Sequence, residues 1–442
     1  MAMTGRGRRI AALFAVASLA SMGLAACSSS GGANDSASAS ASAGEPVTIQ
    51  YLHRLPDGDG MVKVSEIVDR WNADHPDIKV EATKFDGQAG DMIKKLETDV
   101  KAGNAPCLAQ IGYGEVPEMY AKGLLEDVKD YAKQYEGNYS GAFTQMSVGD
   151  AIVGLPQDTG PLVYFYDEAE FKALGLEVPT TLDELKTAAK AAAAKGKYIL
   201  DFEPDEATYW LSGQAAAAGD TWYDGATGEW KVTTTGEGAT KVADFWQEMI
   251  DSKAALTLNR WDDAYTKALS DKQLIGNIGA AWEAGFMLDG IVPDGEQGTW
   301  KVALLPDFGA DGMTGPDGGS GVAVMKGCKF AEQAMQFNDW FNTQTADLAT
   351  QGLVVAAKGE VKTPEKIATQ FGGQDVFGEL AKANDKLSSK FPYIPGFSAV
   401  GAKMTEKAAH VVDGSAKVMD IFTVAQEASV ATLTDLGLPV AK

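Results

Sequence analysis

The sequence predicts an α/β protein built on open sheets. Short apolar and aromatic runs that are typical of strands alternate with amphipathic helices along most of the chain. In the first unit, a strand at 47–52, a helix at 61–73 and a strand beginning at 75–80 follow one another, a spacing that predicts a parallel pair with a right-handed crossover. Roughly 400 residues follow the N-terminal region, which suits two domains with substantial cores.

The N-terminal residues 1–26 are predicted to be a lipoprotein signal peptide. A basic segment with Arg6, Arg8 and Arg9 precedes a short apolar run at 10–22, and Leu-Ala-Ala-Cys follows at 24–27. Processing would make Cys27 the lipid-carrying N-terminus, and two or more acyl chains hold a protein stably on a membrane. The alternative is an ordinary signal peptide followed by a stray cysteine.

Residues 27–45 are predicted to be a flexible tether, because they consist almost entirely of Ser, Ala and Gly. A coil of about 18 residues reaches about 25 Å, enough for a folded body to contact a partner in the membrane. Without residues 1–26 the formal net charge changes from −23 to −26, so nucleic acid is not an expected partner.

The body continues in the same alternating order. A helix is expected at 91–101, followed by a Gly-Asn-Ala-Pro turn and a strand at 107–111. A Gly-Leu-Pro loop at 154–156 precedes an aromatic strand at 162–166. The next helix is expected to begin after an N-cap at Thr180 or Thr181, and Glu184, three residues after Thr181, completes a capping box.

Later elements are predicted from the same patterns. Helices are expected at 182–195, 208–218, 238–250, 262–271 and 330–342; strands at 198–202, 275–281, 300–306 and 322–325; and a hairpin at 222–230. The C-terminal part carries the fewest signals.

Two motifs resemble a known family, the extracellular carbohydrate-binding proteins of ATP-driven importers. The first is Trp-Asn-x-x-His-Pro-Asp-Ile-Lys-Val at 71–80, and the second is the stretch at 154–185. The second stretch matches the family at Gly154, Leu155, Pro156, Phe165, Tyr166, Phe171, Gly175, Leu176, Pro179, Thr180, Thr181, Glu184 and Leu185. It departs at Asp167, where Asn is usual, and Cys107 stands where the family usually has Asp.

The resemblance implies a two-lobed, type II periplasmic-binding-protein-like fold, in which two open α/β sheets are joined by a hinge. Residues 46–155 and 300–344 would form the first lobe, and residues 156–299 and 345–442 the second. It further implies a monomeric receptor that captures an oligosaccharide by hinge closure and delivers it to ABC permease subunits. Its expected location is extracytoplasmic, on the cell membrane, and no cofactor is implied.

The two remaining cysteines, Cys107 and Cys328, have two interpretations. The family's layout places both in one lobe, which allows a disulfide in an exported protein. The alternative is two separate buried thiols.

The candidate ligand contacts come mainly from positions that follow strands, where open α/β sheets bind ligands. Sugars require flat aromatic rings for the ring face, and carboxylates or amides for the hydroxyl edge. Trp282 beside Glu283 supplies both. Each candidate has a structural alternative, such as core packing or a solvated loop. The candidates are His53, Tyr113, Gln157, Asp158, Tyr209, Trp210, Trp282, Glu283, Gly319, Ser320, Tyr393 and Phe397.

Other functions receive less support from the sequence. It has no phosphate-binding loop, nucleophile elbow or dinucleotide fingerprint, and its three histidines are scattered, so no metal site and no enzyme is predicted. Asp158 and Glu283 form a formal carboxylate pair for a glycan-active enzyme, which stays an alternative. The same fold binding a peptide, polyamine or chelate, and a surface adhesin or sensor without a permease, also remain open.

Overall fold

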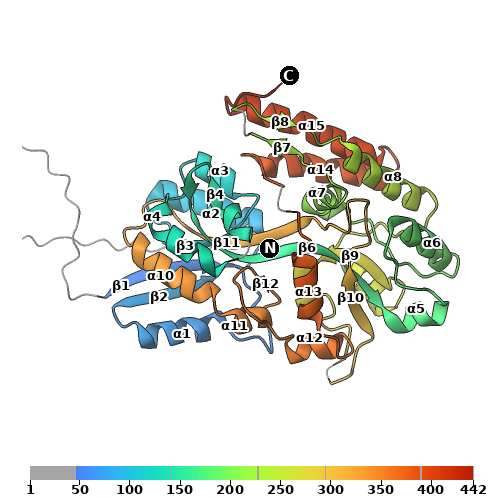
Figure 1. Cartoon of the computed structure of the whole chain (residues 1–442), viewed down its shortest axis with the longest axis horizontal. Coiled ribbons are helices and arrows are strands. Elements are labelled where there is room, and N and C mark those ends of the chain that lie inside the picture. The colour runs from blue at the N-terminus through green and yellow to red at the C-terminus, as the bar shows by residue number, and fades with distance from the viewer. Residues whose placement is uncertain (1–45, 140, 226–227, 294, 389–390, 442) are drawn as a thin grey trace, which may run out of the picture. The chain divides into compact units, whose positions relative to one another are not determined.

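One long strand, β6 (Gly154–Asp167), runs through the whole sheet system and organises the body of the protein (Figure 1). The computed structural model describes residues 46–441 except 140, 226–227, 294 and 389–390. The predicted signal peptide, Cys27 and the tether lie outside the described residues. The described body forms one compact unit.

The first half of β6 belongs to a mixed sheet. Its other members are β1 (Val47–His53), β2 (Ile78–Lys84), β3 (Leu108–Gly112) and β11 (Pro316–Val324), in the order β6-β11-β3-β1-β2. β1 pairs in parallel with β2 and β3, which confirms the predicted βαβ unit, whereas β11 is antiparallel to both of its neighbours. The two-residue strand β12 (Val354–Val355) pairs with β6 on its other edge.

The second half of β6 leaves this sheet and pairs with a different set of strands. These are β9 (Gly276–Ala280) and β10 (Trp300–Leu304), both antiparallel to β6. The strand beginning at Trp300 therefore lies beside residues 163–167, and the chain returns to the first sheet only with β11. The division of the chain into lobes by residue number stays a prediction.

Helices cover both sheets (Figure 1). α1 and α10 lie on one face of the first sheet and α2 and α3 on the other. α14 and α15 pack side by side against α7 and α8, and α13 packs on β10 and β6. The helices around the first sheet are α1 (Val64–Asp74), α2 (Ala89–Ala102), α3 (Val116–Ala121), α4 (Lys129–Ala132) and α10 (Ala331–Asn342). The others are α5 (Glu168–Leu174), α6 (Leu182–Ala193), α7 (Ala207–Ala217), α8 (Glu237–Asp251), α9 (Asp263–Ser270), α11 (Thr345–Thr350), α12 (Glu365–Gln370), α13 (Val376–Asn384), α14 (Phe397–Val412) and α15 (Val418–Asp435).

Short elements complete the fold. Two small antiparallel ladders join β4 (Ser147–Val148) to β5 (Ala151–Ile152) and β7 (Tyr223–Asp224) to β8 (Lys231–Val232). The 3₁₀ turns are η1 (Lys133–Asn138), η2 (Gly141–Met146), η3 (Pro204–Glu206) and η4 (Ala281–Gly285).

Several local predictions need correction. The Gly-Leu-Pro segment is not a loop but the start of β6, because its backbone pairs with β11 at 321–323. The segment at 198–202 forms only single bridges, to Leu274 and Leu256, and no strand. Thr181 does accept a hydrogen bond from the Glu184 amide, but the Glu184 carboxylate bonds to Thr180 instead of completing the capping box on Thr181.

Asp167, the departure from the family pattern, has a clear local role. Its side chain accepts hydrogen bonds from the amides of Ala169 and Glu170 at 3.0 and 3.2 Å and so caps α5. Asp caps a helix as well as Asn does, and its negative charge also suits a helix N-terminus.

The close approach of β6 and β11, near the point where β6 leaves the first sheet, requires glycine. A Cβ atom on Gly160 would lie 2.1 Å from the carbonyl oxygen of Asp317, so no side chain fits there. Gly318 and Gly319 have φ values of 76° and 95°, where the pairing register of β11 shifts. These three glycines let β6 and β11 approach closely and shift register where β6 passes from the first sheet to the second.

Cys107 and Cys328 form a disulfide that joins the start of β3 to the segment after β11. It closes a loop across 221 residues of sequence, with a Cα–Cα distance of 4.8 Å. The bond therefore ties neighbouring strands of the first sheet together at the end away from the point where β6 leaves the sheet.

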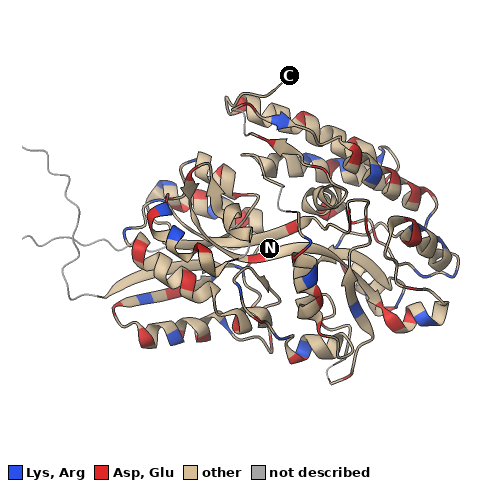
Figure 2. Cartoon of the chain, viewed as in Figure 1, with Lys and Arg blue, Asp and Glu red and all other residues tan. Residues whose placement is uncertain are grey.

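Lys and Arg positions alternate with Asp and Glu positions along the helices of the body (Figure 2). None of the described helices is long and apolar enough to cross a membrane.

Candidate functional site

A cleft of about 370 Å³ lies where the strand ends of the first sheet face loops of the second half of the fold. One wall consists of polar side chains on and after β1, β3, β6 and β11. The opposite wall is aromatic and comes from η3, α7, η4 and the segment before α9. The lining residues are Arg54, Leu55, Pro56, Gln88, Ala89, Gln110, Gly112, Tyr113, Gly114, Glu115, Asp158, Glu206, Tyr209, Trp261, Trp282, Phe286, Asp317, Gly318, Gly319, Ser320, Gln351, Gly352 and Leu353.

The polar wall is a chain of hydrogen bonds fixed to the sheet. Asp158 on β6 lies opposite Ser320 on β11 and accepts hydrogen bonds from the Ser320 amide at 2.7 Å and hydroxyl at 2.5 Å. Gln110 donates to the Ser320 hydroxyl at 3.0 Å and accepts from the Arg54 amide at 2.8 Å. Among the described residues, the bonds to the Asp158 side chain all reach Oδ1, so Oδ2 is the oxygen placed to accept from a ligand.

Two tyrosines and Glu115 connect the walls. Tyr113 donates through its hydroxyl to the Asp158 carbonyl at 2.8 Å. Tyr209, on α7, reaches Glu115 with a long hydrogen bond of 3.4 Å to Oε1. Among the described residues, no partner bonds to the buried Oε2 of Glu115. This oxygen is closed off from the cleft and faces Gly112, where a Cβ atom would lie 2.2 Å from it.

The aromatic wall contains three rings that lie nearly parallel, which we call the aromatic platform: Trp261, Trp282 and Phe286. Ring centroids are 5.5 to 6.4 Å apart and interplanar angles are 5° to 24°. Trp282 donates its indole N–H to the Asp317 carbonyl at 2.9 Å, and Trp261 donates to the Glu206 carboxylate. The Trp261 side chain is 53% exposed, which is high for a large apolar side chain.

Beneath the platform lies a buried ion pair. Arg260 contacts Glu283 through Nε at 2.8 Å and through a terminal guanidinium nitrogen at 2.7 Å, and both side chains are below 8% exposure. The other carboxylate oxygen of Glu283 accepts from the Ala280 amide at 2.9 Å. The Arg260 guanidinium carbon lies 5.1 Å from the ring centroid of Trp261 and 5.6 Å from that of Phe286.

The cleft carboxyl groups hold protons more tightly than carboxyls in water. Burial raises the pKa of Asp158 to about 6, although the hydrogen bonds from Ser320 oppose this shift. Burial also raises the pKa of Glu206 to about 6. The pKa of Asp317 lies well above its usual value because of burial and the charges of Glu206 and Glu283, and burial raises the pKa of Glu115. An uncharged, hydrogen-bonding ligand suits such a site better than an anion.

Half of the residues predicted from the sequence line this cleft. They come from both walls; five lie near strand ends, and Tyr209 was predicted from the resemblance to the family. They are Tyr113, Asp158, Tyr209, Trp282, Gly319 and Ser320.

Five predicted contacts do not line it, because their side chains point into the core. His53 ends β1 but is buried beside Tyr51, and burial lowers its pKa to about 4. Gln157 points to the opposite side of β6 from Asp158 and donates to Asn342 at 3.0 Å. Strand alternation therefore separates two adjacent candidates.

The other three candidates that do not line the cleft are also core residues. Trp210 is fully buried and donates to the Ile278 carbonyl at 3.0 Å. Phe397 packs against Tyr209 and Tyr393. Glu283 holds Arg260 instead of facing the cleft, because η4 turns it inward while Trp282 faces outward.

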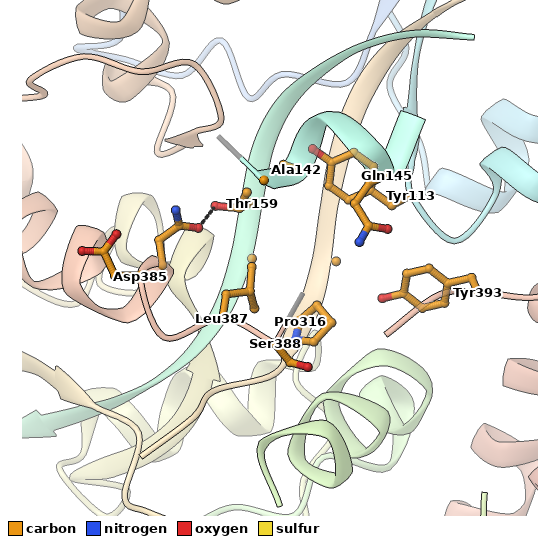
Figure 3. Close-up of a pocket in the computed structure, with 13 residues that line it drawn as sticks. Tyr113, Ala142, Gln145, Thr159, Pro316, Asp385, Leu387, Ser388 and Tyr393 are labelled. Carbon is orange, nitrogen blue, oxygen red and sulfur yellow. Dashed lines mark hydrogen bonds between the residues drawn. The ribbon is translucent and has the colours of Figure 1, made fainter. Parts of the chain in front are cut away.

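Tyr393 lies outside the cleft, at a second cavity of about 190 Å³ (Figure 3). This cavity shares Tyr113 with the cleft and includes Thr159, whose hydroxyl donates to Asn384 at 2.7 Å. The buried Tyr393 hydroxyl has no hydrogen-bond partner among the described residues.

The sequence patterns did not reveal several of the cleft residues. Trp261 follows a non-periodic segment, and an isolated tryptophan outside any helical stripe was the available signal. Glu206 and Asp317 adjoin predicted elements but carry no pattern that separates them from the chain's many surface acids. The missed side chains are Gln110, Glu115, Glu206, Trp261, Phe286 and Asp317.

Within the described part of the chain, no group of three or more His, Cys, Asp or Glu side chains is placed to hold a metal ion.

Comparison with known proteins identifies the class. Residues 58–347 match the bacterial extracellular solute-binding protein family. The chain belongs to this family. Its mixed α/β architecture, with one strand shared between two sheets, is the two-lobed, type II fold of periplasmic sugar-binding proteins, as the sequence predicts.

A solved structure is similar to this chain along its whole length. The chain is 53% identical to the galacto-N-biose-/lacto-N-biose I-binding protein of the ABC transporter from Bifidobacterium longum, whose structure contains lacto-N-biose. That match covers 90% of this chain and 100% of the other, with a TM-score of 0.87.

Two curated relatives match over shorter stretches. An uncharacterised lipoprotein in the oleD 5′ region of Streptomyces antibioticus is 27% identical over 207 residues, which is 45% of each chain. The multiple sugar-binding protein of Streptococcus mutans is 27% identical over 195 residues, which is 41% of each. The matches thus span less than half of these curated relatives.

Proposed function

We propose that this protein is the extracytoplasmic sugar receptor of an ABC-type carbohydrate importer, and that its ligand is a disaccharide of the galacto-N-biose and lacto-N-biose class. The observation that carries the proposal is the cleft itself, in which an aromatic platform faces a wall of hydrogen-bonding carboxyl, amide and hydroxyl groups. The 53% identity to a lacto-N-biose-binding protein along that protein's whole length supports the ligand class.

The two walls of the cleft contact different parts of the sugar. The platform of Trp261, Trp282 and Phe286 receives the apolar face of a sugar ring. Asp158 Oδ2 accepts a hydrogen bond from a hydroxyl group at its edge. Because the walls come from the two halves of the fold, a ligand that contacts both favours the closed arrangement, and the permease then recognises the closed receptor.

The rest of the proposal concerns the cell surface. Cys27 carries the lipid anchor after removal of residues 1–26, and residues 27–45 are the tether that lets the monomeric body reach the permease. A lipoprotein among the relatives supports this arrangement. The protein captures and delivers its ligand without covalent chemistry.

Calorimetric titration of the exported chain without residues 1–27 tests the proposal. The panel is galacto-N-biose, lacto-N-biose, lactose, maltose and maltotriose. Saturable binding of the first two, with the sugars recovered uncleaved, is the expected result. Binding of maltose alone would refute the proposed ligand class. Cleavage of the sugar would refute the proposal that the protein acts without covalent chemistry. No binding across the panel would refute the proposal that the ligand is a sugar.

A cationic solute is the second candidate function. Four cleft carboxyl groups, those of Glu115, Asp158, Glu206 and Asp317, face one lining cation, Arg54. Spermidine and a basic dipeptide therefore belong in the same titration. Binding of either in place of sugar would favour this candidate.

A further inference from the structure

The buried ion pair below the aromatic platform suggests a role that the cleft lining alone does not reveal. Arg260 and Glu283 do not contact the cleft, yet Arg260 contacts two of the three platform rings. This inference rests on the proposed function, since it concerns how the sugar platform is held.

The contacts form an ordered stack from the core to the cleft. Tyr265, on α9, is buried in the core, and its ring centroid lies 4.5 Å from the Arg260 guanidinium carbon. The guanidinium next meets Trp261 and Phe286, whose rings line the cleft. A cation held against several aromatic faces in a water-poor site interacts with them more strongly than an exposed one.

Glu283 fixes the guanidinium within this stack. Its Oε2 contacts two guanidinium nitrogens, and its Oε1 accepts from the Ala280 amide at the end of β9. The carboxylate therefore connects the stack to the backbone of the second sheet. Trp282 precedes Glu283 in η4, so the same short turn sets the third platform ring.

The backbone on the Trp261 side is fixed as well. The Arg260 amide donates to Asp205 at 2.8 Å, and the Trp261 amide donates to the same carboxylate at 3.4 Å. The Trp261 indole N–H donates to Glu206. An indole that is 53% exposed would otherwise sample several rotamers, and binding would have to order it.

We propose that Arg260 and Glu283 are positioning residues that preorganise the aromatic platform for its sugar, with Arg260 acting through Trp261 and Phe286. The pair raises sugar affinity by holding the rings in their binding orientation before the ligand arrives.

The test replaces both charges together, because removing one partner of a buried ion pair leaves the other uncompensated and threatens folding. Arg260→Met with Glu283→Gln removes both charges while Gln keeps the acceptor for the Ala280 amide. The matched control is Arg70→Met with Asp347→Asn, an Arg–carboxylate pair that is partly exposed and does not line the cleft. Arg260→Lys, which keeps the charge but lacks the planar guanidinium, is the conservative variant.

Affinity for lacto-N-biose or galacto-N-biose is the first measurement. The double variant should weaken binding about tenfold at an unchanged thermal midpoint, and the control pair should not. In a background with Trp261→Ala and Phe286→Ala the same double change should alter affinity by less than about twofold, since both rings through which Arg260 acts are then absent. Equal losses in both backgrounds, or no loss in either, would overturn the proposal.

A second measurement needs no sugar. The near-UV circular dichroism of the unliganded protein minus that of its Trp261→Phe variant reports how rigidly the Trp261 ring is held. This difference should be large in the wild-type protein and the control pair, and weak in Arg260→Met/Glu283→Gln. A full difference signal in the double variant refutes positioning even if the wild-type protein binds none of the sugars.

Arg260→Lys decides the question if the double variant does not fold. This variant should show a smaller circular dichroism difference than the wild-type protein, and its sugar affinity should be about threefold lower. Wild-type values of both would overturn the proposal.

Discussion

The two walls of the cleft are built in different ways. The polar wall is attached to strands, and Asp158 owes its place to a register in which it lies opposite Ser320 on β11. The aromatic wall is attached to η4 and an irregular segment, and its rings owe their places to side chains such as Arg260. Sheet register therefore fixes one wall, and tertiary contacts fix the other.

This difference bears on recognition. Hydrogen bonds demand accurate placement of donor and acceptor, which a sheet provides. Apolar stacking tolerates small shifts, so a wall on loops can serve it and can also move. We expect the polar wall to select the sugar and the aromatic wall to supply most of the affinity. The following predictions test that division, from the largest expected effect to the smallest.

Removing the platform should have the largest effect. Trp261→Ala with Trp282→Ala should lower sugar affinity by about a thousandfold or more, because each ring is expected to contribute at least about 2 kcal/mol as a buried aromatic anchor. Titration calorimetry measures the loss. Trp340→Phe, on α10 beside Trp71, is the matched control and should bind normally. A loss below tenfold would show that the polar wall dominates.

Breaking the disulfide should affect the scaffold of the polar wall but not the site. Cys107→Ser with Cys328→Ser should reduce the free energy of unfolding by about 2–5 kcal/mol, because the bond restricts a long loop in the unfolded chain. Thermal and urea unfolding measure this loss, and calorimetry should find unchanged affinity. Weaker binding at unchanged stability would contradict the prediction.

Changing the polar wall alone should have an intermediate effect. Asp158→Asn removes the charge that accepts from Ser320 and from the proposed ligand, and should cost about 1.5–3 kcal/mol of binding free energy. The loss should differ between lacto-N-biose and galacto-N-biose, which a purely stacking interaction would not cause. Asp99→Asn, on an exposed face of α2, is the control. Equal losses for both sugars would argue against selection by this wall.

The smallest expected effect is a pH dependence of stability. Asp158 and Glu206 have folded-state pKa values raised to about 6, so the folded protein binds more protons than the unfolded chain between about pH 4 and 6. Stability from these groups is therefore present at low pH and is lost as pH rises through about 6, by about 1–1.5 kcal/mol for each group between pH 5 and 7.5.

Urea midpoints of the unliganded protein at pH 5 and 7.5 measure this difference, with the midpoint higher at pH 5. Asp158→Asn should remove part of it, since the amide does not titrate. A urea midpoint that is higher at pH 7.5 than at pH 5 would contradict the raised pKa values.

The sequence predicted the fold better than the site. The βαβ unit, the aromatic strand and the Thr181 cap follow from local patterns, because neighbouring residues alone determine them. The prediction of a loop at 154–156 was wrong. Glycine and proline indicate a turn locally, but here their backbone pairs with β11 and forms part of a strand.

For the site, Asp158 and Trp282 were found because each lies near a strand end, a feature the sequence displays. Glu283 was placed on the wrong side of its turn, because the direction of a side chain in η4 depends on Arg260, 23 residues away. Trp261 and Phe286 join Trp282 only through contacts between segments that are separate in sequence.

The sequence by itself determined most of the strands and helices as far as α10 and the match to the family, because these depend on periodicity, capping and composition along the chain. The tertiary structure alone decided which members of each candidate pair face the cleft, such as Asp158 and not Gln157. It also decided the ion pair below the platform. The physical reason is that orientation toward a shared cleft is set by packing between distant segments, which no local pattern records.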